Sequence, residues 1–302
     1  MATTSELADA TGPGIISHTY HAEAHALSGK LRRPIEQEIE HQAKLVLHDL
    51  QGGHFTRLAE QVSVQGLIQF RKAHTLVSGS RSLKHNGWVT LSTSVVEELD
   101  VFEVIQADRL VSQVSTDHPY ENGHVPHVTF LGTQFDNVRV SGFPLELQVD
   151  LGVCGNKPAN DESYLRDPHF LRTVKEQTER IAKAKDLPRE LQAEYDERLA
   201  RIDGLLSASG NGSSSQHERK VLCSLVQRIG DVPIPGAKSF GNLLVLPEFG
   251  TVAFGELEVG ETVHEDKPEV YFELTSLRMS LGCIGDGKVH TSIVRANGRT
   301  KP

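Results

Sequence analysis

The chain has 302 residues, of which 40 are acidic and 31 are basic, so its formal charge is −9 with histidine neutral. That length suffices for one large or two ordinary domains, and its 26 glycines and 13 prolines exclude the collagenous and disordered classes. A net-acidic chain lacks the clustered basic residues of general nucleic-acid binders, so we expect no nucleic-acid partner.

The amino-terminal segment MATTSELADATGPG has neither a basic start nor an apolar stretch, and it does not resemble a secretory signal. No apolar run approaches the ~18 residues that span a bilayer, so we expect no membrane insertion. The three cysteines (Cys154, Cys223, Cys283) are scattered and form no CxxC pair, which argues against a disulfide scaffold or zinc ribbon. A cytoplasmic location is the simplest interpretation, and a removed export signal is the alternative.

In chain order, residues 1–14 are interpreted as a flexible tail and residues 15–156 as a β-rich region. Apolar and polar residues alternate from Val62 to Ile68, which is typical of a half-buried strand. Asn86-Gly87 predicts a tight hairpin turn, because both residue types reach positive φ easily.

The second half of this region is less regular. Residues 99–116 have mixed residues on both faces, which fits either one strand covered on both sides or two strands bent at Asp108. Residues 127–152 indicate three short strands broken by glycines.

Residues 157–208 are rich in charge and predict a helical hairpin. Asp167 followed by Pro168 is a good N-cap and first-position pair, and a second helix is expected to start near Pro188. The Gly/Ser-rich residues 209–216 are predicted to form a flexible linker.

Residues 217–302 form a second β-rich region, which we expect to complete the same domain as the first. The predicted fold is therefore mainly β, as a sandwich, a barrel-like sheet or a β-solenoid. With the inserted α-helical hairpin, the class is α+β overall.

The chain has fifteen histidines, and the densest group is His18, His21, Glu23 and His25. On a strand, His21 and His25 share a face but lie ~13 Å apart, too far for one metal ion with bonds of ~2.0–2.2 Å. On a helix they would be neighbours. His21, Glu23 and His25 are therefore a metal-site candidate that requires a helix, and a solvated strand face is the alternative.

A second group comprises His118, His124 and His127, in a turn-rich segment that also carries Asp117 and Glu121. Functional residues concentrate in such loops, so these three histidines are our candidate binding residues. The alternative is a polar loop between strands. The common catalytic motifs GxSxG, GxxxxGK[ST], HExxH and GxGxxG are absent, and we assign no catalytic residue.

Two segments resemble parts of other β-rich proteins: VTFLGTQFDNVRVSGFPLELQVDLG and MSLGCIGDGKVHTSIVRANG. Their short strands and turns resemble a group of uncharacterised bacterial β-rich proteins and, more distantly, surface proteins of the choice-of-anchor type. The resemblance implies a β fold and no particular catalytic residue. The charged hairpin departs from that pattern.

We expect a non-catalytic binding or structural β module without a cofactor that associates with itself or with a protein partner, because the edges of sheets can pair with another chain. The alternative is a metal-dependent hydrolase with a divalent transition metal, which requires the two histidine groups to meet in space. Its candidate ligands are His21, Glu23, His25, His118, His124 and His127. A third possibility is a small-ligand or glycan binder that stacks its ligand on Trp88.

Overall fold

The computed structural model describes residues 17–82, 86–208, 218–264, 267–282 and 286–301. Strands with alternating buried and exposed side chains make up most of this part of the chain. In β1 (Ser17–Leu31), for example, Tyr20, Ala22 and Ala24 are buried, whereas the residues between them are partly exposed. This period of two is the signature of a strand with one face against a core. The prediction of a mainly β fold with an α-helical hairpin is confirmed.

Nine strands form the first antiparallel sheet, sheet A. Its first and last strands in the chain are neighbours, since β1 pairs with β19 along its whole length. The order is β15 (Lys238–Phe240), β16 (Leu243–Leu246), β17 (Gly250–His264), β18 (Lys267–Leu281), β19 (Gly287–Lys301), β1 and β2 (Gln37–Gln42), with β13 (Glu218–Ser224) beside β17 and β3 (Leu45–Asp49) beside β1.

Eight strands form the second antiparallel sheet, sheet B. The order is β11 (Phe143–Pro144), β10 (Arg139–Val140), β7 (Ile105–His118), β6 (Trp88–Val101), β5 (Ile68–Arg81) and β4 (Gly53–Val64), with β8 (His127–Thr129) and β9 (Gln134–Asp136) beside β7. A separate pair joins β12 (Leu147–Val149) to β14 (Val226–Ile229).

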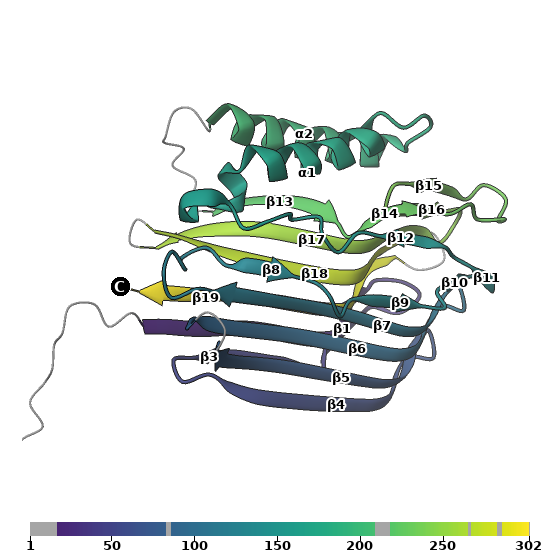
Figure 1. Ribbon diagram of the computed structural model, residues 1–302. Coiled ribbons are helices and arrows are strands. Elements are labelled where there is room, and N and C mark those ends of the chain that lie inside the picture. Colours follow the sequence, from purple (N-terminus) through teal and green to yellow (C-terminus); the bar gives the residue numbers. More distant parts are fainter. Residues whose placement is uncertain (1–16, 83–85, 209–217, 265–266, 283–285, 302) are drawn as a thin grey trace, which may run out of the picture.

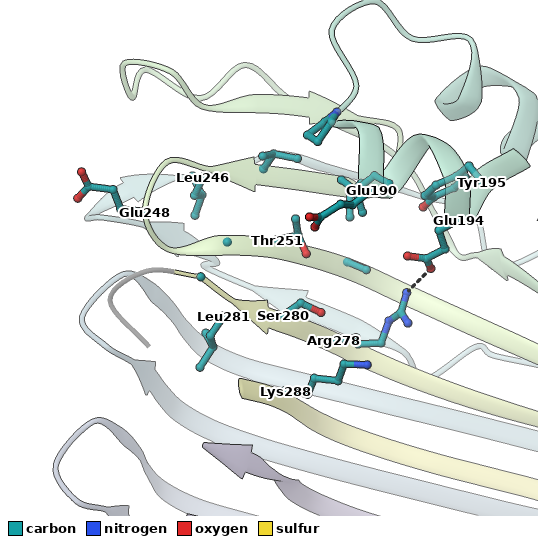
Figure 2. A pocket seen from close by; sticks show the side chains of 17 residues that line it. Glu190, Glu194, Tyr195, Leu246, Glu248, Thr251, Arg278, Ser280, Leu281 and Lys288 are labelled. Carbon is teal, nitrogen blue, oxygen red and sulfur yellow. Dashed lines mark ion pairs between the residues drawn. The ribbon is translucent and has the colours of Figure 1, made fainter. Parts of the chain in front are cut away.

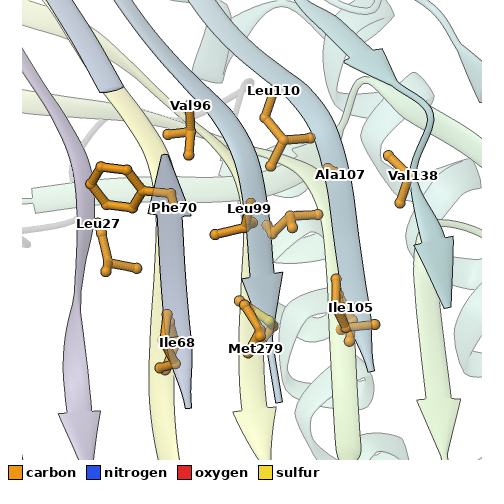
Figure 3. Packing of buried hydrophobic residues seen from close by; sticks show 14 of the residues in the cluster. Leu27, Ile68, Phe70, Val96, Leu99, Ile105, Ala107, Leu110, Val138 and Met279 are labelled. Atoms are coloured by element: carbon orange, nitrogen blue, oxygen red, sulfur yellow. The ribbon is translucent and has the colours of Figure 1, made fainter. Parts of the chain in front are cut away.

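The two sheets lie face to face, with β1 and β19 of sheet A against β5, β6 and β7 of sheet B (Figure 1). Buried side chains from both sheets fill the space between them, among them Leu27 and Met279 from sheet A and Phe70 and Leu99 from sheet B (Figure 3). Burial of such apolar surface is the main source of stability in a sandwich of this kind.

Buried serines also join the two sheets. Ser112 Oγ on β7 donates to the carbonyl oxygen of Ser292 on β19 at 2.5 Å, and Ser292 Oγ donates to the carbonyl oxygen of Ser94 on β6 at 2.9 Å. All three side chains are fully buried. Each hydroxyl donates to a backbone carbonyl oxygen, that of Ser94 to His25, which offsets the cost of burying these polar groups.

The helical hairpin covers the β13 side of sheet A (Figure 1). Two short 3-10 turns, η1 (Ala159–Asp161) and η2 (Tyr164–Arg166), precede α1 (Pro168–Ala182), and α2 (Arg189–Ala208) follows. Asp167 caps α1, because its side chain accepts a hydrogen bond of 2.9 Å from the backbone N–H of His169. Phe170 and Val174 pack in one cluster with Val221 and Cys223 of β13.

Several finer predictions need correction. The alternating residues 62–68 are not one strand: β4 and β5 meet there in a turn at Gln65 and Gly66, both at positive φ. Residues 99–116 do not bend at Asp108, because the chain reverses at Phe102 and Glu103, again at positive φ.

Residues 127–152 contain five short strands, not three. The predicted hairpin connection at Asn86-Gly87 lies where expected, with Asn86 at φ 49° and β5 and β6 paired on either side. The predicted tail at residues 1–14 and the predicted linker at residues 209–216 lie outside the described residues.

Candidate functional site

β1 and β7 each place one histidine inside the protein, near the end of the sandwich where β19 finishes beside β1 (Figure 1). His18 alternates into the interior with Tyr20, and His118 does so with Thr116. His18 is 3% exposed and His118 is 0% exposed. Their ring centroids are 4.7 Å apart, so the two imidazoles contact each other. We call them the histidine pair.

Aromatic rings enclose the histidine pair. The Trp88 ring stacks on His18 with a centroid distance of 5.1 Å and an interplanar angle of 11°. Tyr20 meets His18 edge-on with ring centroids 4.8 Å apart, and Tyr120 stacks on Trp88 with ring centroids 5.9 Å apart. This wall excludes water and lowers the local dielectric around the two imidazoles.

Backbone and hydroxyl groups hold one nitrogen of each imidazole. His118 Nδ1 lies 2.7 Å from the carbonyl oxygen of Gly123, and His18 Nδ1 lies 3.0 Å from Thr300 Oγ1. Thr300 Oγ1 in turn donates to the same Gly123 oxygen at 3.1 Å. A third histidine joins this network, because His124 Nδ1 lies 3.2 Å from the carbonyl oxygen of Thr300.

The loop that supplies Gly123 is fixed by a carboxylate from the segment before α1. Asp161 accepts hydrogen bonds from the backbone N–H groups of His124 and Val125, at 2.9 and 3.0 Å, and forms an ion pair with Lys157 at 2.9 Å. Burial opposes ionisation of Asp161, but the hydrogen bonds from Lys157 and the two backbone groups outweigh it and lower the pKa of this carboxyl. The loop is therefore held in one position beside the histidine pair.

The other nitrogen of each imidazole has no hydrogen-bond partner among the described residues. Both atoms, His18 Nε2 and His118 Nε2, are buried. Both also face Gly298 of β19: a Cβ built there would lie 2.5 Å from His18 Nε2 and 3.0 Å from His118 Nε2. Only glycine fits this position, because any side chain would collide with the two rings.

Both imidazoles are held in their neutral form. Burial, together with the neighbouring His118, lowers the pKa of His18 to about 2. Burial also lowers the pKa of His118 to about 4, although its hydrogen bond to Gly123 opposes that shift. A neutral imidazole with a bare nitrogen is a metal ligand or a hydrogen-bond acceptor.

The structure brings together two of the three histidines expected to form a binding site. His118 and His124 share the Gly123–Thr300 network, whereas His127 is exposed on β8 and lies apart, opposite Asp117. The turn-rich segment was thus a useful signal for His118 and His124.

The other candidate group, His21, Glu23 and His25, lies on a strand and faces the opposite side of β1 from His18. There His21 Nε2 contacts Glu23 Oε1 at 3.2 Å, and the ring of His25 meets that of His41 with centroids 4.5 Å apart. The two histidine-rich segments do meet in space, but they do so through His18, which sequence analysis left out of its candidate residues. Strand alternation puts His18 on the opposite face from that group, and the structure shows that this face is the buried one.

A groove of 640 Å³ lies elsewhere, between the start of α2 and the outer face of sheet A (Figure 2). Its walls are partly apolar, with Leu191 and Leu246 among the lining residues. Its central cation, Arg278, is engaged by Glu256 at 2.5 Å and by Glu194 at 3.7 Å. Because Arg278 is already paired, the groove gives weaker evidence of a ligand than the histidine pair, whose two Nε2 atoms have no hydrogen-bond partner among the described residues.

Among the described residues, no helix is both long and apolar enough to cross a membrane.

Comparison with known proteins gives one match. Residues 18–260 match the model of the family described as a domain of unknown function (DUF8256). No curated protein and no solved structure matches the chain. Because the matched segment covers well over half of the sequence, the chain belongs to the DUF8256 family.

Proposed function

We propose that the protein is a non-catalytic structural module that self-associates by pairing its strand β4 with β4 of a second copy. The single observation that carries the proposal is that β4 ends sheet B as a long edge strand. It has 12 residues and pairs with β5 on one side, and no described strand pairs with its other side. Such an edge presents a row of free backbone groups to another chain.

The other sheet edges are short or covered. At one edge of sheet A, β2 has six residues and β3 has five, and at the other β15 has three. Strand β13 is covered by the helical hairpin, with α1 and α2 both in contact with it. Natural sheets avoid pairing with other chains by keeping their edge strands short or covered. Strand β4 differs from the other edge strands because it is both long and uncovered by a described strand.

The sequence of β4 has only part of the usual protection, the two charged side chains Arg57 and Glu60. The segment GHFTRLAEQVSV contains no lysine and no proline, the two residues that most often block an edge. Two of its apolar side chains are about half exposed, Phe55 at 48% and Leu58 at 51%. Val46 and Leu50, on or next to the neighbouring β3, are exposed to a similar degree or more.

A second copy is the occupant that this surface suits best. Two antiparallel β4 strands related by a two-fold axis would present the same patch to each other, which is the usual geometry of homodimers. Backbone hydrogen bonds supply the pairing, and the exposed apolar side chains add buried area.

Sedimentation velocity over a range of protein concentrations tests the proposal. We expect the wild type to shift from monomer to dimer, and Leu58→Lys to weaken the dimer by at least about ten-fold, because two like charges would meet near the axis. Leu131→Lys is the matched control, since Leu131 is an exposed leucine outside β4, at 77% exposure. A wild type that stays monomeric at all concentrations would refute the proposal, as would equal effects of the two variants.

The structure favours this proposal over the hydrolase alternative. That alternative requires the group on β1 to meet the second histidine group, but His21, Glu23 and His25 lie on the outer face of β1, and His118 is buried between the sheets. Trp88, the proposed stacking surface for a glycan, is 4% exposed and already stacked between His18 and Tyr120.

A further inference from the structure

The protonation of the histidine pair follows from its hydrogen bonds. A carbonyl oxygen only accepts, so the contact with Gly123 requires a proton on His118 Nδ1. The hydroxyl group of Thr300 donates its only proton to the same carbonyl oxygen. Thr300 Oγ1 must therefore accept a hydrogen bond from His18 Nδ1. Each Nδ1 therefore carries a proton, and a second proton on either Nε2 would be buried without an acceptor among the described residues, so each Nε2 is a bare lone pair.

Both Nε2 atoms lie within 3.0 Å of the point where a Cβ of Gly298 would stand, and two bare lone pairs this close repel each other unless a donor or a cation lies between them. A direct hydrogen bond between the two Nε2 atoms would need a third proton and hence an imidazolium. Its charge would lie in a ring buried against Trp88 and Tyr20, which disfavours an imidazolium, whereas a metal ion at the same place would gain a coordinate bond from each nitrogen. The remaining occupants are a water molecule that donates to both nitrogens, or a metal ion that both nitrogens bind.

The arrangement around the pair is the one found around metal-binding histidines. Such histidines bind through one ring nitrogen and donate the other N–H to a backbone carbonyl or a similar acceptor, which fixes the tautomer and the ring orientation. His118 makes this contact with Gly123 directly, and His18 makes it through Thr300. A side chain at position 298 would collide with both rings, so glycine at this position lets the two imidazoles lie side by side against β19.

We propose that His18 and His118 bind a late first-row transition metal ion, copper(I) in preference to zinc, through their two Nε2 atoms. This site is independent of β4 and of the proposed self-association. Imidazole nitrogen suits both metals. Structural zinc takes four ligands, whereas copper(I) is stable with two. Among the described residues no group of three or more histidine, cysteine or acidic side chains gathers around one point, so the low coordination number of copper(I) fits the site better.

Metal titration of the full chain tests the proposal. The protein is first dialysed against a chelator and then titrated with copper(I), kept reduced by ascorbate, in the presence of a competing copper(I) chelator. We expect one equivalent to bind. We expect His118→Asn to weaken binding at least about 100-fold, because loss of an outer partner of a ligand alone costs 10–100-fold. Asparagine keeps an N–H near the position of Nδ1, for Gly123, and has no atom at Nε2.

The matched control is His25→Asn, which removes a histidine from the outer face of β1, the strand that carries His18, and should leave copper affinity unchanged. X-ray absorption of the copper-loaded wild type gives a second readout that does not depend on a variant that folds, and we expect two imidazole nitrogens as nearest neighbours. If the protein binds zinc instead of copper, and that binding depends on His118, the choice of metal is overturned. Absence of binding, equal effects of the two variants, or a crystal structure with a water molecule bridging the two Nε2 atoms after copper addition would overturn the site.

Discussion

His25 shows how one partly buried histidine makes stability depend on pH. Burial lowers its pKa to about 3, and the neighbouring His41, Lys44 and His290 add to the shift while Glu23 opposes it. The unfolded chain has an ordinary histidine pKa near 6.5, so below that pH the unfolded state takes up a proton that folded His25 does not. The stability associated with neutral His25 is therefore complete above about pH 6.5 and is lost as the pH falls toward about 3.

We expect His25→Gln to reduce this acid sensitivity. In that window the slope of unfolding free energy against pH should fall by up to about 1.4 kcal/mol per pH unit, which is the effect of one proton. Urea unfolding at several pH values measures the slope. His127→Gln, at an exposed histidine on β8, is the control and should follow the wild type. Parallel curves for wild type and His25→Gln would show that His25 does not titrate differently in the folded state.

For single residues, the sequence predicts which face of a strand a side chain occupies, but it does not predict which distant side chains contact it there. The alternation of β1 separates His18 from His21, Glu23 and His25, as the structure confirms. The partners of His18 come from positions 88, 118 and 300, which no local pattern connects to position 18. The histidine pair was therefore out of reach of sequence reasoning, although half of it, His118, was among the candidates.

At the scale of elements, the start of α1 depends on one side chain. Asp167 accepts from the backbone N–H of His169 at 2.9 Å, and Pro168 occupies the first helical position. Asp167→Ala should cost about 1 kcal/mol of unfolding free energy, whereas Asp167→Asn should cost little, because asparagine caps about as well. Urea unfolding followed by circular dichroism compares the three proteins. If alanine and asparagine destabilise equally, the cap is not the source of the effect.

The helices were easier to predict than the hairpins between strands, for a physical reason. Asp167-Pro168 is a local signal that needs no distant partner. The turns at Gln65-Gly66 and at Phe102-Glu103 place residues at positive φ that seldom adopt it, with only one glycine among the four. Such turns form because the paired strands on either side hold them, so of these three hairpins only the one at Asn86-Gly87 had a local signal in the sequence.

At the scale of the whole molecule, the continuity of sheet A depends on the pairing of β1 with β19, the first and last described strands. His18 stands opposite Thr300 in the pairing of β1 with β19, so the strand that starts the described chain lies beside the one that ends it. Because period-two patterns are alike in every strand, they predict a β fold without predicting which strands pair. Sheet order, and with it the exposed position of β4, comes from the structure alone.

Hydrogen–deuterium exchange of the β4 amides as a function of protein concentration tests the proposed self-association most directly. Alternate amides of an edge strand point away from the sheet, and they become protected only when another strand pairs with them. We predict that amides within Gly53–Val64 exchange quickly in dilute protein and more slowly in concentrated protein, while those of the short edge strand β2 keep the same rate. Exchange in β4 that does not change with concentration would contradict the proposal that this strand joins two copies.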